Sequence, residues 1–380
     1  MYRFAKMAVI WITASAMLTG CWDLKNAQDI NYFTAIGFDY ADDEYVVYVQ
    51  MLDFTTVAKT EAGASNENPQ VWIGIGRGET PSRAVNDLYD TAQLRVFYGH
   101  IDSIILSENV IKQGMETVLD ALNRYYEMRY TPWLFATDEP IDKLMSVSIF
   151  FNMSSIVSLM HQPKESFKQK SKIPPKESHA FIQQFREPGN TAFIPSLGLV
   201  AGKWEKNEDR QTMMDIDGIF VFKDKKYKGK LPQSEIKGLR WTREETNRSP
   251  VYLHSGGKIT VVLSLERPRV KIEPRQEDGK ITYHYKVKLG GNVSEIFEPL
   301  PEAEMEKLAA QYVREEIRDF YEKGLKIDAD VLRLEHALYR QNNALWKKQR
   351  DAGQLRLTKE SLQIEVDVQL ESSGKMKMRQ

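Results

Sequence analysis

The chain has one cysteine, Cys21, among its 380 residues. An intramolecular disulfide is therefore impossible, and the fold has to be held together by its hydrophobic core alone. Hydrophobic residues make up 42% of the sequence, an ordinary share for a globular protein. We therefore expect a body with full hydrophobic cores rather than a small module stapled by disulfides.

The residues before Cys21 have the pattern of a secretory signal. Arg3 and Lys6 give a cationic start, an apolar run covers residues 7–16, and Leu-Thr-Gly leads into Cys21. An apolar run this short does not span a bilayer stably. Small residues directly before a cysteine match the lipobox of bacterial lipoproteins. The signal is then cut between Gly20 and Cys21, the thiol receives an S-diacylglycerol group, and the new amino group is commonly acylated. A stray cysteine in a secreted protein and an uncleaved anchor helix are the alternatives.

Lipidation of Cys21 predicts firm attachment to a membrane. Burying acyl chains contributes about 0.8 kcal/mol per methylene, and two or three chains hold a protein essentially permanently. The mature chain has 50 Lys and Arg against 53 Asp and Glu, so it lacks the basic excess of a nucleic-acid-binding protein. We expect a tethered body on the outer face of the membrane, with no nucleic-acid partner.

Hydrophobic patterning predicts mixed α/β structure in the first half of the mature chain. A hairpin joins residues 30–40 and 45–52 through the polar turn 41–44, and Thr80-Pro81 has the N-cap and N1 residues of a helix start. The other predicted elements are strands at 71–75, 101–107 and 131–136, and helices at 81–94 and 110–125. Residues 163–178 hold five lysines and three prolines, which predicts a mobile connector that protease cuts first.

The second half predicts strands followed by helices. Strands are expected at 193–200 and 218–222, the latter turning at 223–226. A long hairpin is expected over 258–272 and 280–293. Helices are then expected from Met305 to Leu325 and at 329–350, before an alternating strand at 362–370. The fold class is α+β or mixed α/β, with mainly antiparallel sheets faced by helices. The predicted divisions are a signal (1–20), an N-terminal α/β domain (21–162), a connector (163–178), a middle α/β domain (179–255), a β-β-α-α-β domain (256–372) and a polar tail (373–380).

Motifs of catalysis are missing from the sequence. The six histidines stand apart, with no HxH or HExxH zinc pattern and no second cysteine, and no G-x-S-x-G elbow occurs. Gly74-Ile75-Gly76-Arg77-Gly78 precedes a helix but is neither GxGxxG nor a P-loop, so a tight turn explains it better than a phosphate cradle. The acid pairs Asp42-Asp43 and Glu244-Glu245 do not have acid–base spacing, and the dispersed tryptophans at 22, 72, 133, 204, 241 and 346 are expected mostly in the core. We predict no enzyme activity, no catalytic residue, no metal and no cofactor.

A series of motifs in order resembles the Ger(x)C lipoproteins, the C subunits of spore germinant receptors. The mature start Cys21-Trp22-Asp23-Leu24 leads to Ile36-Gly37-Phe38-Asp39, as in the GCWD…GIGxD opening of that family. The later matches are Tyr98-Gly99-His100 before a strand, Gly218–Leu231, Gly291–Glu295 and Asp330–Trp346. Ile219-Phe220 and Leu334-Glu335 depart from the family pattern, which bears on the subfamily.

The resemblance implies a lipid-anchored, non-enzymatic subunit of a nutrient germinant receptor, needed for the germination response. It further implies a three-domain α/β body on the outer face of the cell membrane that becomes the inner spore membrane. The partners would be two integral-membrane subunits, of the A and B types. The alternatives are a solute-binding lipoprotein of a transporter and a lipid-anchored hydrolase. The first needs two lobes of βαβ units where this sequence has long hairpins, and the second lacks a nucleophile, a base and a metal set.

Replacing the single thiol tests the anchor. Cys21→Ala should abolish incorporation of labelled fatty acid and leave the signal uncut by the lipoprotein peptidase, because both steps require the cysteine. Metabolic labelling and the apparent mass of the product measure both effects. Continued lipid labelling of the Cys21→Ala chain would contradict the lipobox interpretation.

Overall fold

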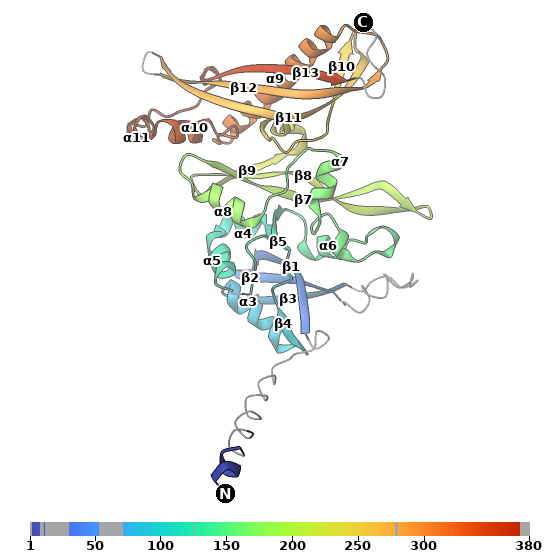
Figure 1. Ribbon diagram of the computed structural model, residues 1–380, viewed down its shortest axis with the longest axis vertical. Helices are drawn as coiled ribbons and strands as arrows, with labels where there is room; N and C mark the ends of the chain where they lie inside the picture. Colours follow the sequence, from blue (N-terminus) through green and yellow to red (C-terminus); the bar gives the residue numbers. More distant parts are fainter. Residues whose placement is uncertain are drawn as a thin grey trace.

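The computed structural model describes residues 2–7, 11, 30–52, 71–125, 127–277 and 280–372. Its elements form three layers along the long axis, with the first strands at one end and the last strands at the other (Figure 1). Two sheets provide the framework, one of nine strands and one of four. The fold is mixed α/β with mostly antiparallel pairs, as the sequence predicts.

The nine-stranded sheet has the order β3-β2-β1-β5-β6-β7-β8-β9, with β4 paired to β1. Its strands are β1 (Ile30–Ala41), β2 (Glu44–Leu52), β3 (Val71–Gly78), β4 (Arg95–Phe97), β5 (Ser103–Ser107), β6 (Trp133–Thr137), β7 (Thr191–Lys206), β8 (Asp209–Lys223) and β9 (Lys226–Pro232). The strands β1, β5, β6 and β7 run parallel, whereas the flanking hairpins are antiparallel. This sheet runs through both the predicted N-terminal domain and the predicted middle domain, whose boundaries stay a prediction.

Helices of the first two layers pack on both faces of this sheet. They are α3 (Pro81–Asp87), α4 (Glu108–Gly114), α5 (Glu116–Arg124), α6 (Ile141–Met145), α7 (Pro163–Gln169) and α8 (Ser178–Arg186), with short 3-10 turns at Leu88–Asp90, Phe150–Asn152 and Ser155–Val157. Thr80 caps α3 by accepting a hydrogen bond from the Arg83 amide, with Pro81 in the first turn, as predicted. The predicted helix at 110–125 is two helices, because the backbone departs from helical geometry at Gly114, where φ is +126°.

The prediction of a mobile connector over residues 163–178 is wrong. Pro163 begins α7, and Ser171, Ile173 and Lys176 are buried. The Ser171 amide donates to the Arg248 carbonyl at 2.9 Å, and the Lys176 carbonyl accepts from the Leu134 amide at 2.8 Å. Lysine and proline content indicated a loop, but this segment packs between layers, where tertiary contacts satisfy its backbone.

The four-stranded sheet has the order β10-β11-β12-β13. It consists of β10 (Ser249–Ser255), β11 (Lys258–Glu277), β12 (Lys280–Ile296) and β13 (Leu362–Ser372), preceded by 3-10 turns at Gln233–Glu235 and Lys237–Thr242. The long hairpin β11–β12 and the final strand are confirmed, but β10 was not predicted. The C-terminal sheet is mainly antiparallel, as predicted, but β13 pairs with β12 in parallel after the helices cross over.

The helix α9 (Glu302–Lys326) lies against the four-stranded sheet on the side of the middle layer (Figure 1). The apolar face predicted for it is buried at Met305, Ala309, Val313, Ile317, Phe320 and Tyr321. The second predicted helix at 329–350 is instead α10 (Leu334–Gln341) and α11 (Asn343–Asp351), separated at Asn342, whose side chain accepts from the Leu345 amide at 3.0 Å. A last 3-10 turn at Lys359–Ser361 precedes β13.

The polar turns predicted in the hairpins are confirmed. Asp42 and Asp43 join β1 to β2 with φ of +54° and +63°. Asp224 and Lys225 join β8 to β9 in the same way, with φ of +49° and +62°. Two successive residues with positive φ match the right-handed twist of the flanking strands, and Asp tolerates this backbone better than most residues. The predicted turn between β11 and β12 includes residues 278–279, which lie outside the described residues.

Strands β7 and β8 supply the middle of the body. Phe193 and Val221 face the core shared with the C-terminal sheet, whereas Ile194 and Phe220 face the core shared with the N-terminal layer. Phe220 is 0% exposed and stacks on Tyr227, with 5.6 Å between ring centroids. Each of these two strands therefore contributes to two cores.

Truncating Phe220 should destabilise the protein strongly. Phe220→Ala should lower the free energy of unfolding by about 3–5 kcal/mol, because it leaves a cavity in a core that cannot collapse fully. Urea denaturation followed by circular dichroism measures the change. Phe151→Ala is the matched control, since Phe151 is 93% exposed and its loss should change stability by no more than about 0.5 kcal/mol. Equal effects of the two variants would contradict the assignment of Phe220 to the core.

Candidate functional site

The predicted lipidation site lies outside the described residues. Cys21, the cut after Gly20 and the motif residues 22–24 therefore stay predictions. Within the described part of the chain, no helix combines the length and the apolar character that a membrane crossing requires.

The histidines lie in separate surroundings. His161 is buried, His179 lies 3.5 Å from a Glu177 oxygen, His336 lies 3.7 Å from a Glu187 oxygen, and the His100 ring packs edge-on against Tyr32. His254 and His284 lie on β10 and β12. Among the residues that the structure describes, no three His, Cys, Asp or Glu side chains are placed to hold a metal ion.

His161 belongs to a polar cluster that sequence spacing does not reveal. Its Nδ1 contacts a carboxylate oxygen of Asp102, and its Nε2 lies 2.9 Å from Oε1 of Gln50. The amide of Gln50 donates to the Met145 carbonyl at 2.8 Å, and the Thr34 hydroxyl donates to Gln50 Oε1 at 3.1 Å. Both ring nitrogens are thus occupied by side chains of the protein. The cluster joins β1, β2 and the segment after α6 and leaves the ring no nitrogen for a substrate.

Gly74, Gly76 and Gly78 serve packing. A Cβ on Gly76 would lie 2.1 Å from the Ala84 carbonyl oxygen, so only glycine lets α3 approach β3 this closely. All three lie within β3, an edge strand paired to β2, and not in a turn as predicted. Close packing of α3 on β3 therefore explains these glycines in place of the predicted tight turn.

The acid pairs and tryptophans are placed as follows. Asp42 and Asp43 form a hairpin turn, and Glu244 and Glu245 are exposed after a 3-10 turn. Trp241 and Trp346 are core residues and Trp133 is partly buried, but Trp72 and Trp204 are 61% and 56% exposed. The prediction that most tryptophans are in the core is therefore wrong for these two, and Trp22 lies outside the described residues.

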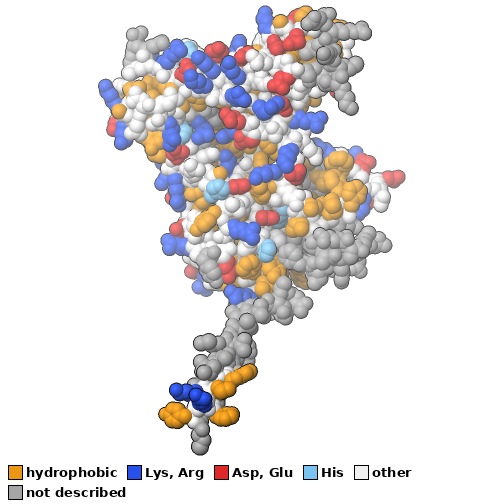
Figure 2. Space-filling view, viewed as in Figure 1, with side chains coloured by type: hydrophobic (Ala, Val, Ile, Leu, Met, Phe, Trp, Pro, Cys, Tyr) orange, Lys and Arg blue, Asp and Glu red, His pale blue; other side chains and the backbone are white. Residues whose placement is uncertain are grey.

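Trp204 takes part in an exposed aromatic cluster. Its ring lies 5.0 Å from that of Phe150, which in turn lies 6.2 Å from Phe151. Met153 is also exposed beside them. Figure 2 shows hydrophobic side chains gathered on the side of the body where the β7–β8 hairpin projects. The cluster gives this face an apolar contact surface.

A surface hollow of about 580 Å³ lies between the 3-10 turn after α3 and the end of α5. Tyr89, Leu94, Val96, Tyr98 and Tyr125 line it. Its charged residues, Arg95 and Glu127, pair with each other at 3.4 Å. Burial and the hydrogen bond to Tyr89 raise the pKa of Tyr98, so the lining hydroxyl stays protonated. The hollow is aromatic and holds no nucleophile with a base beside it.

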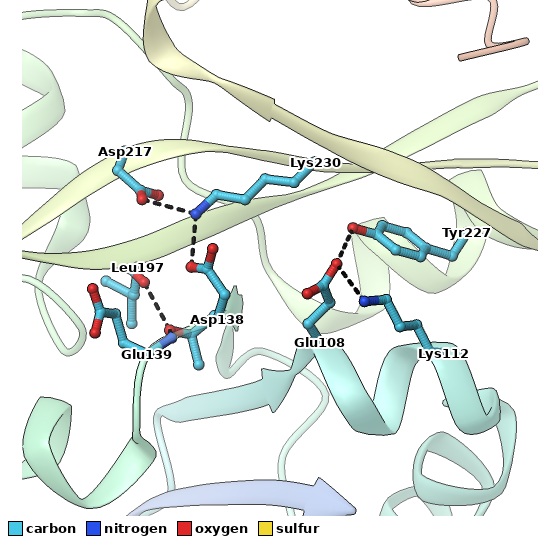
Figure 3. A network of polar contacts seen from close by, with 9 residues as sticks. Glu108, Lys112, Asp138, Glu139, Leu197, Asp217, Tyr227 and Lys230 are labelled. Atoms are coloured by element: carbon cyan, nitrogen blue, oxygen red, sulfur yellow. Dashed lines mark hydrogen bonds and ion pairs between the residues drawn. The ribbon is translucent and has the colours of Figure 1, made fainter.

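A second polar network joins the N-terminal layer to β8 and β9 (Figure 3). Lys230 Nζ lies 2.7 Å from Asp138 and 2.9 Å from Asp217, and Tyr227 donates to Glu108 at 3.0 Å. Burial alone would lower the pKa of Lys230, but the two carboxylates outweigh it and raise that pKa. The lysine therefore stays charged, and its ion pairs link the N-terminal layer to β8 and β9.

This network lies where the sheet itself is weakest. The β6–β7 pairing is recorded at a single register position, Ala136 opposite Ser196. Next to it the Thr137 hydroxyl donates to the Leu197 carbonyl at 2.9 Å, and the Glu139 amide donates to the Thr137 hydroxyl at 2.9 Å (Figure 3). Side chains therefore supply links that the short ladder does not.

Glu316 of α9 anchors the next junction. Arg240 donates to both of its carboxylate oxygens, at 3.0 and 2.8 Å, and the Trp241 indole donates at 2.7 Å. A Cβ on Gly238 would lie 2.3 Å from the Glu316 carbonyl oxygen, so glycine permits the close approach. A buried carboxylate held by three donors is a structural clamp, because its oxygens are already occupied.

Comparison with known proteins identifies two family domains in this chain. Residues 23–199 match the spore germination protein N-terminal domain, and residues 217–374 match the spore germination B3/GerAC-like C-terminal domain. The chain belongs to the GerAC-like family of spore germination proteins. The boundary between the two matches falls in the β7–β8 hairpin.

Relatives of this GerAC-like chain span its length. Spore germination protein KC of Bacillus subtilis (strain 168) is 22% identical, with 92% of this chain and 91% of the relative covered. Spore germination protein A3 of the same organism is also 22% identical, covering 74% and 72%. The crystal structure of the GerBC protein matches with a TM-score of 0.55 at 15% identity, covering 88% of this chain and 96% of that one. The predicted fold is thus confirmed.

The family motif at Asp330–Trp346 has a physical role in the structure. Asp330 is buried, and its carboxylate accepts from the Glu335 amide at 2.7 Å, which fixes the turn into α10. The Glu335 side chain accepts from the Trp346 indole at 3.2 Å and lies 3.6 Å from Lys223 Nζ. The motif ties α10 and α11 to the end of β8.

Asp330 should make stability depend on pH in an unusual direction. Burial raises its pKa to about 6, above the value of about 3.9 for an unfolded aspartate. The folded state therefore binds the proton more tightly, so this group's contribution to stability falls as pH rises from about 4 to about 6. The stability of Asp330→Asn relative to wild type should rise across that interval and level off above it. Denaturant unfolding at each pH measures the difference.

The adjacent Asp328 is the matched control. It pairs with Lys228 at 2.6 Å, and that hydrogen bond lowers its pKa. Its contribution is present at neutral pH and is lost on acidification, so Asp328→Asn should show the opposite trend. Parallel pH profiles for the two variants would contradict the assignment for Asp330.

Proposed function

We propose that this protein is a lipid-anchored, non-enzymatic subunit of a spore nutrient germinant receptor, needed for the germination response. The observation that carries the proposal is the match of both family domains, in order, over residues 23–199 and 217–374. Relatives named as spore germination proteins cover most of the same chain. The lipobox ending at Cys21 supports attachment through an S-diacylglycerol and an acylated amino group.

The partners in this proposal are two integral-membrane receptor subunits, of the A and B types. The body would lie on the outer face of the cell membrane that becomes the inner spore membrane, tethered at residue 21. A function based on contact suits the polar clusters, whose atoms are engaged within the protein at His161, Lys230 and Glu316. The exposed aromatic cluster around Phe151 and Trp204 supplies apolar surface for such contacts.

Removing the protein from spores tests the role. Deletion should abolish germination triggered by the nutrients of its receptor, while germination forced by agents that bypass receptors should be unchanged. The loss of absorbance of a spore suspension measures both responses. If the receptor is a minor one, both partner subunits are overexpressed in parent and mutant before the comparison.

Co-purification from spore membranes is the direct measurement. The wild-type chain should travel with its two membrane partners. An abundant, membrane-bound chain that never travels with the partners would refute the receptor role.

A further inference from the structure

Three cations converge where the middle layer meets the C-terminal layer. Lys176 precedes α8, Arg243 follows the 3-10 turn at Lys237–Thr242, and Arg333 precedes α10. Lys176 Nζ lies 4.4 Å from the centroid of the Phe193 ring, and Arg243 Cζ lies 5.2 Å from the same centroid. Arg333 acts electrostatically on both Lys176 and Arg243. One aromatic ring of β7 is therefore flanked by two cations, with a third nearby.

None of these cations forms an ion pair within the described part of the chain, although Glu245 acts electrostatically on Lys176 and Arg243, and Glu187 and Asp330 act on Arg333. Lys176 donates to the amide oxygen of Gln184 at 3.1 Å, and Arg333 donates to that of Asn190 at 2.9 Å. Both acceptors are neutral. The ion pairs of the described residues are formed by other cations, and the Arg243 guanidinium packs on the Phe193 ring. The contrast with Lys230 and Arg240, each held by carboxylates, is plain.

Unused hydrogen-bond donors lie around the same cluster. Nε of Arg243 is shut off from solvent with no hydrogen-bond partner among the described residues. The same holds for Nδ2 of Asn190, whose other amide atom binds Arg333, and for the hydroxyl of Thr191 at the start of β7. A buried donor without an acceptor costs free energy, and such groups in native structures call for an explanation.

Repulsion among these like charges adds to the free-energy cost of the cluster in the folded protein. Burial, and then the charges of Arg243 and Arg333, lower the pKa of Lys176 to about 7. Burial and the charge of Arg333 lower the pKa of Arg243 to about 10. Charges buried near charges of the same sign destabilise a fold unless a counterion is present.

We propose that Lys176, Arg243 and Arg333 form a binding site for an oxyanion, either a phosphate or a carboxylate. Guanidinium groups match the geometry of such oxygens, and a lysine adds a point charge. The amide of Asn190 and the hydroxyl of Thr191 are neutral donors for the remaining oxygens. Lys176 belongs to the N-terminal family domain and both arginines to the C-terminal one, so a bound oxyanion clamps the two domains together. This inference does not depend on the proposed receptor role.

The test measures stabilisation of the full chain, purified in detergent, by small anions. Thermal unfolding is followed while inorganic phosphate or acetate is added, with sodium chloride at matched ionic strength as the reference. A ligand that binds only the folded state raises the midpoint in a saturable way. Phosphate saturating at lower concentration than acetate assigns a phosphate group, and the reverse assigns a carboxylate.

Variants separate a binding role from a structural one. Arg243→Met should weaken anion binding at least about tenfold, because charge-assisted hydrogen bonds are lost. Lys176→Met should raise the midpoint of the anion-free protein, since it removes a buried repulsive charge, and should reduce the response to anions. Lys172→Met is the matched control, because Lys172 is partly buried and donates to the Gln233 amide oxygen at 2.8 Å. Its anion response should equal that of wild type.

Two results would overturn the site. One is a wild-type protein that responds to phosphate and acetate no more than to chloride, a result that requires no variant to fold. The other is an anion response that Arg243→Met and Lys172→Met leave equally intact. Glu245 is exposed, and its charge acts on Lys176 and Arg243. In the first case, anion binding by Glu245→Gln alone would show that the protein's own carboxylate fills the site in place of an external ligand.

Discussion

Over residues 192–194 of β7 and 219–222 of β8, even-numbered and odd-numbered side chains belong to two different hydrophobic cores. Ala192, Ile194, Phe220 and Phe222 pack with the N-terminal layer, whereas Phe193, Ile219 and Val221 pack with the C-terminal layer. A strand buried on both faces reads as a continuous apolar run, which is what GIFVF at residues 218–222 is. The layers on either side depend on these two strands, because neither core is complete without them.

Polar side chains add specific contacts between the layers that the hydrophobic cores bring together. The β6–β7 ladder is short, and Lys230 with Asp138 and Asp217 bridges the same junction. Between the middle layer and α9, Glu316 receives Arg240 and Trp241. A buried charge pair adds little net stability over apolar packing, but it leaves few alternative ways for two layers to meet. The cations around Phe193 differ, since none of them forms an ion pair among the described residues.

The polar side chains described above are therefore engaged in contacts between parts of the protein. His161, which has an aspartate beside it, has both ring nitrogens occupied, and in the hollow lined by Tyr89 and Tyr98 the carboxylate of Glu127 is paired with Arg95. Membership of the GerAC-like family fits a body that presents surfaces. The exposed rings of Phe150 and Trp204, which contact each other, belong to that description, since exposed apolar patches mark contact surfaces.

The local sequence pattern was sufficient to predict the long hairpins, the helix face from Met305 to Tyr321 and the polar turns. Each of these depends on the spacing of residues within a short stretch of chain. The lipobox at Cys21, also read from neighbouring residues along the chain, stays a prediction. The sequence did not reveal that residues 163–178 are packed, that β13 joins β12 in parallel, or that one sheet runs through the predicted N-terminal and middle domains. Those features depend on partners far away along the chain, whose contacts outweigh local preference. The meeting of Lys176, Arg243 and Arg333 at one aromatic ring is of the same kind. Each is an ordinary surface residue by its neighbours in sequence, and only the packing of three layers makes them a site.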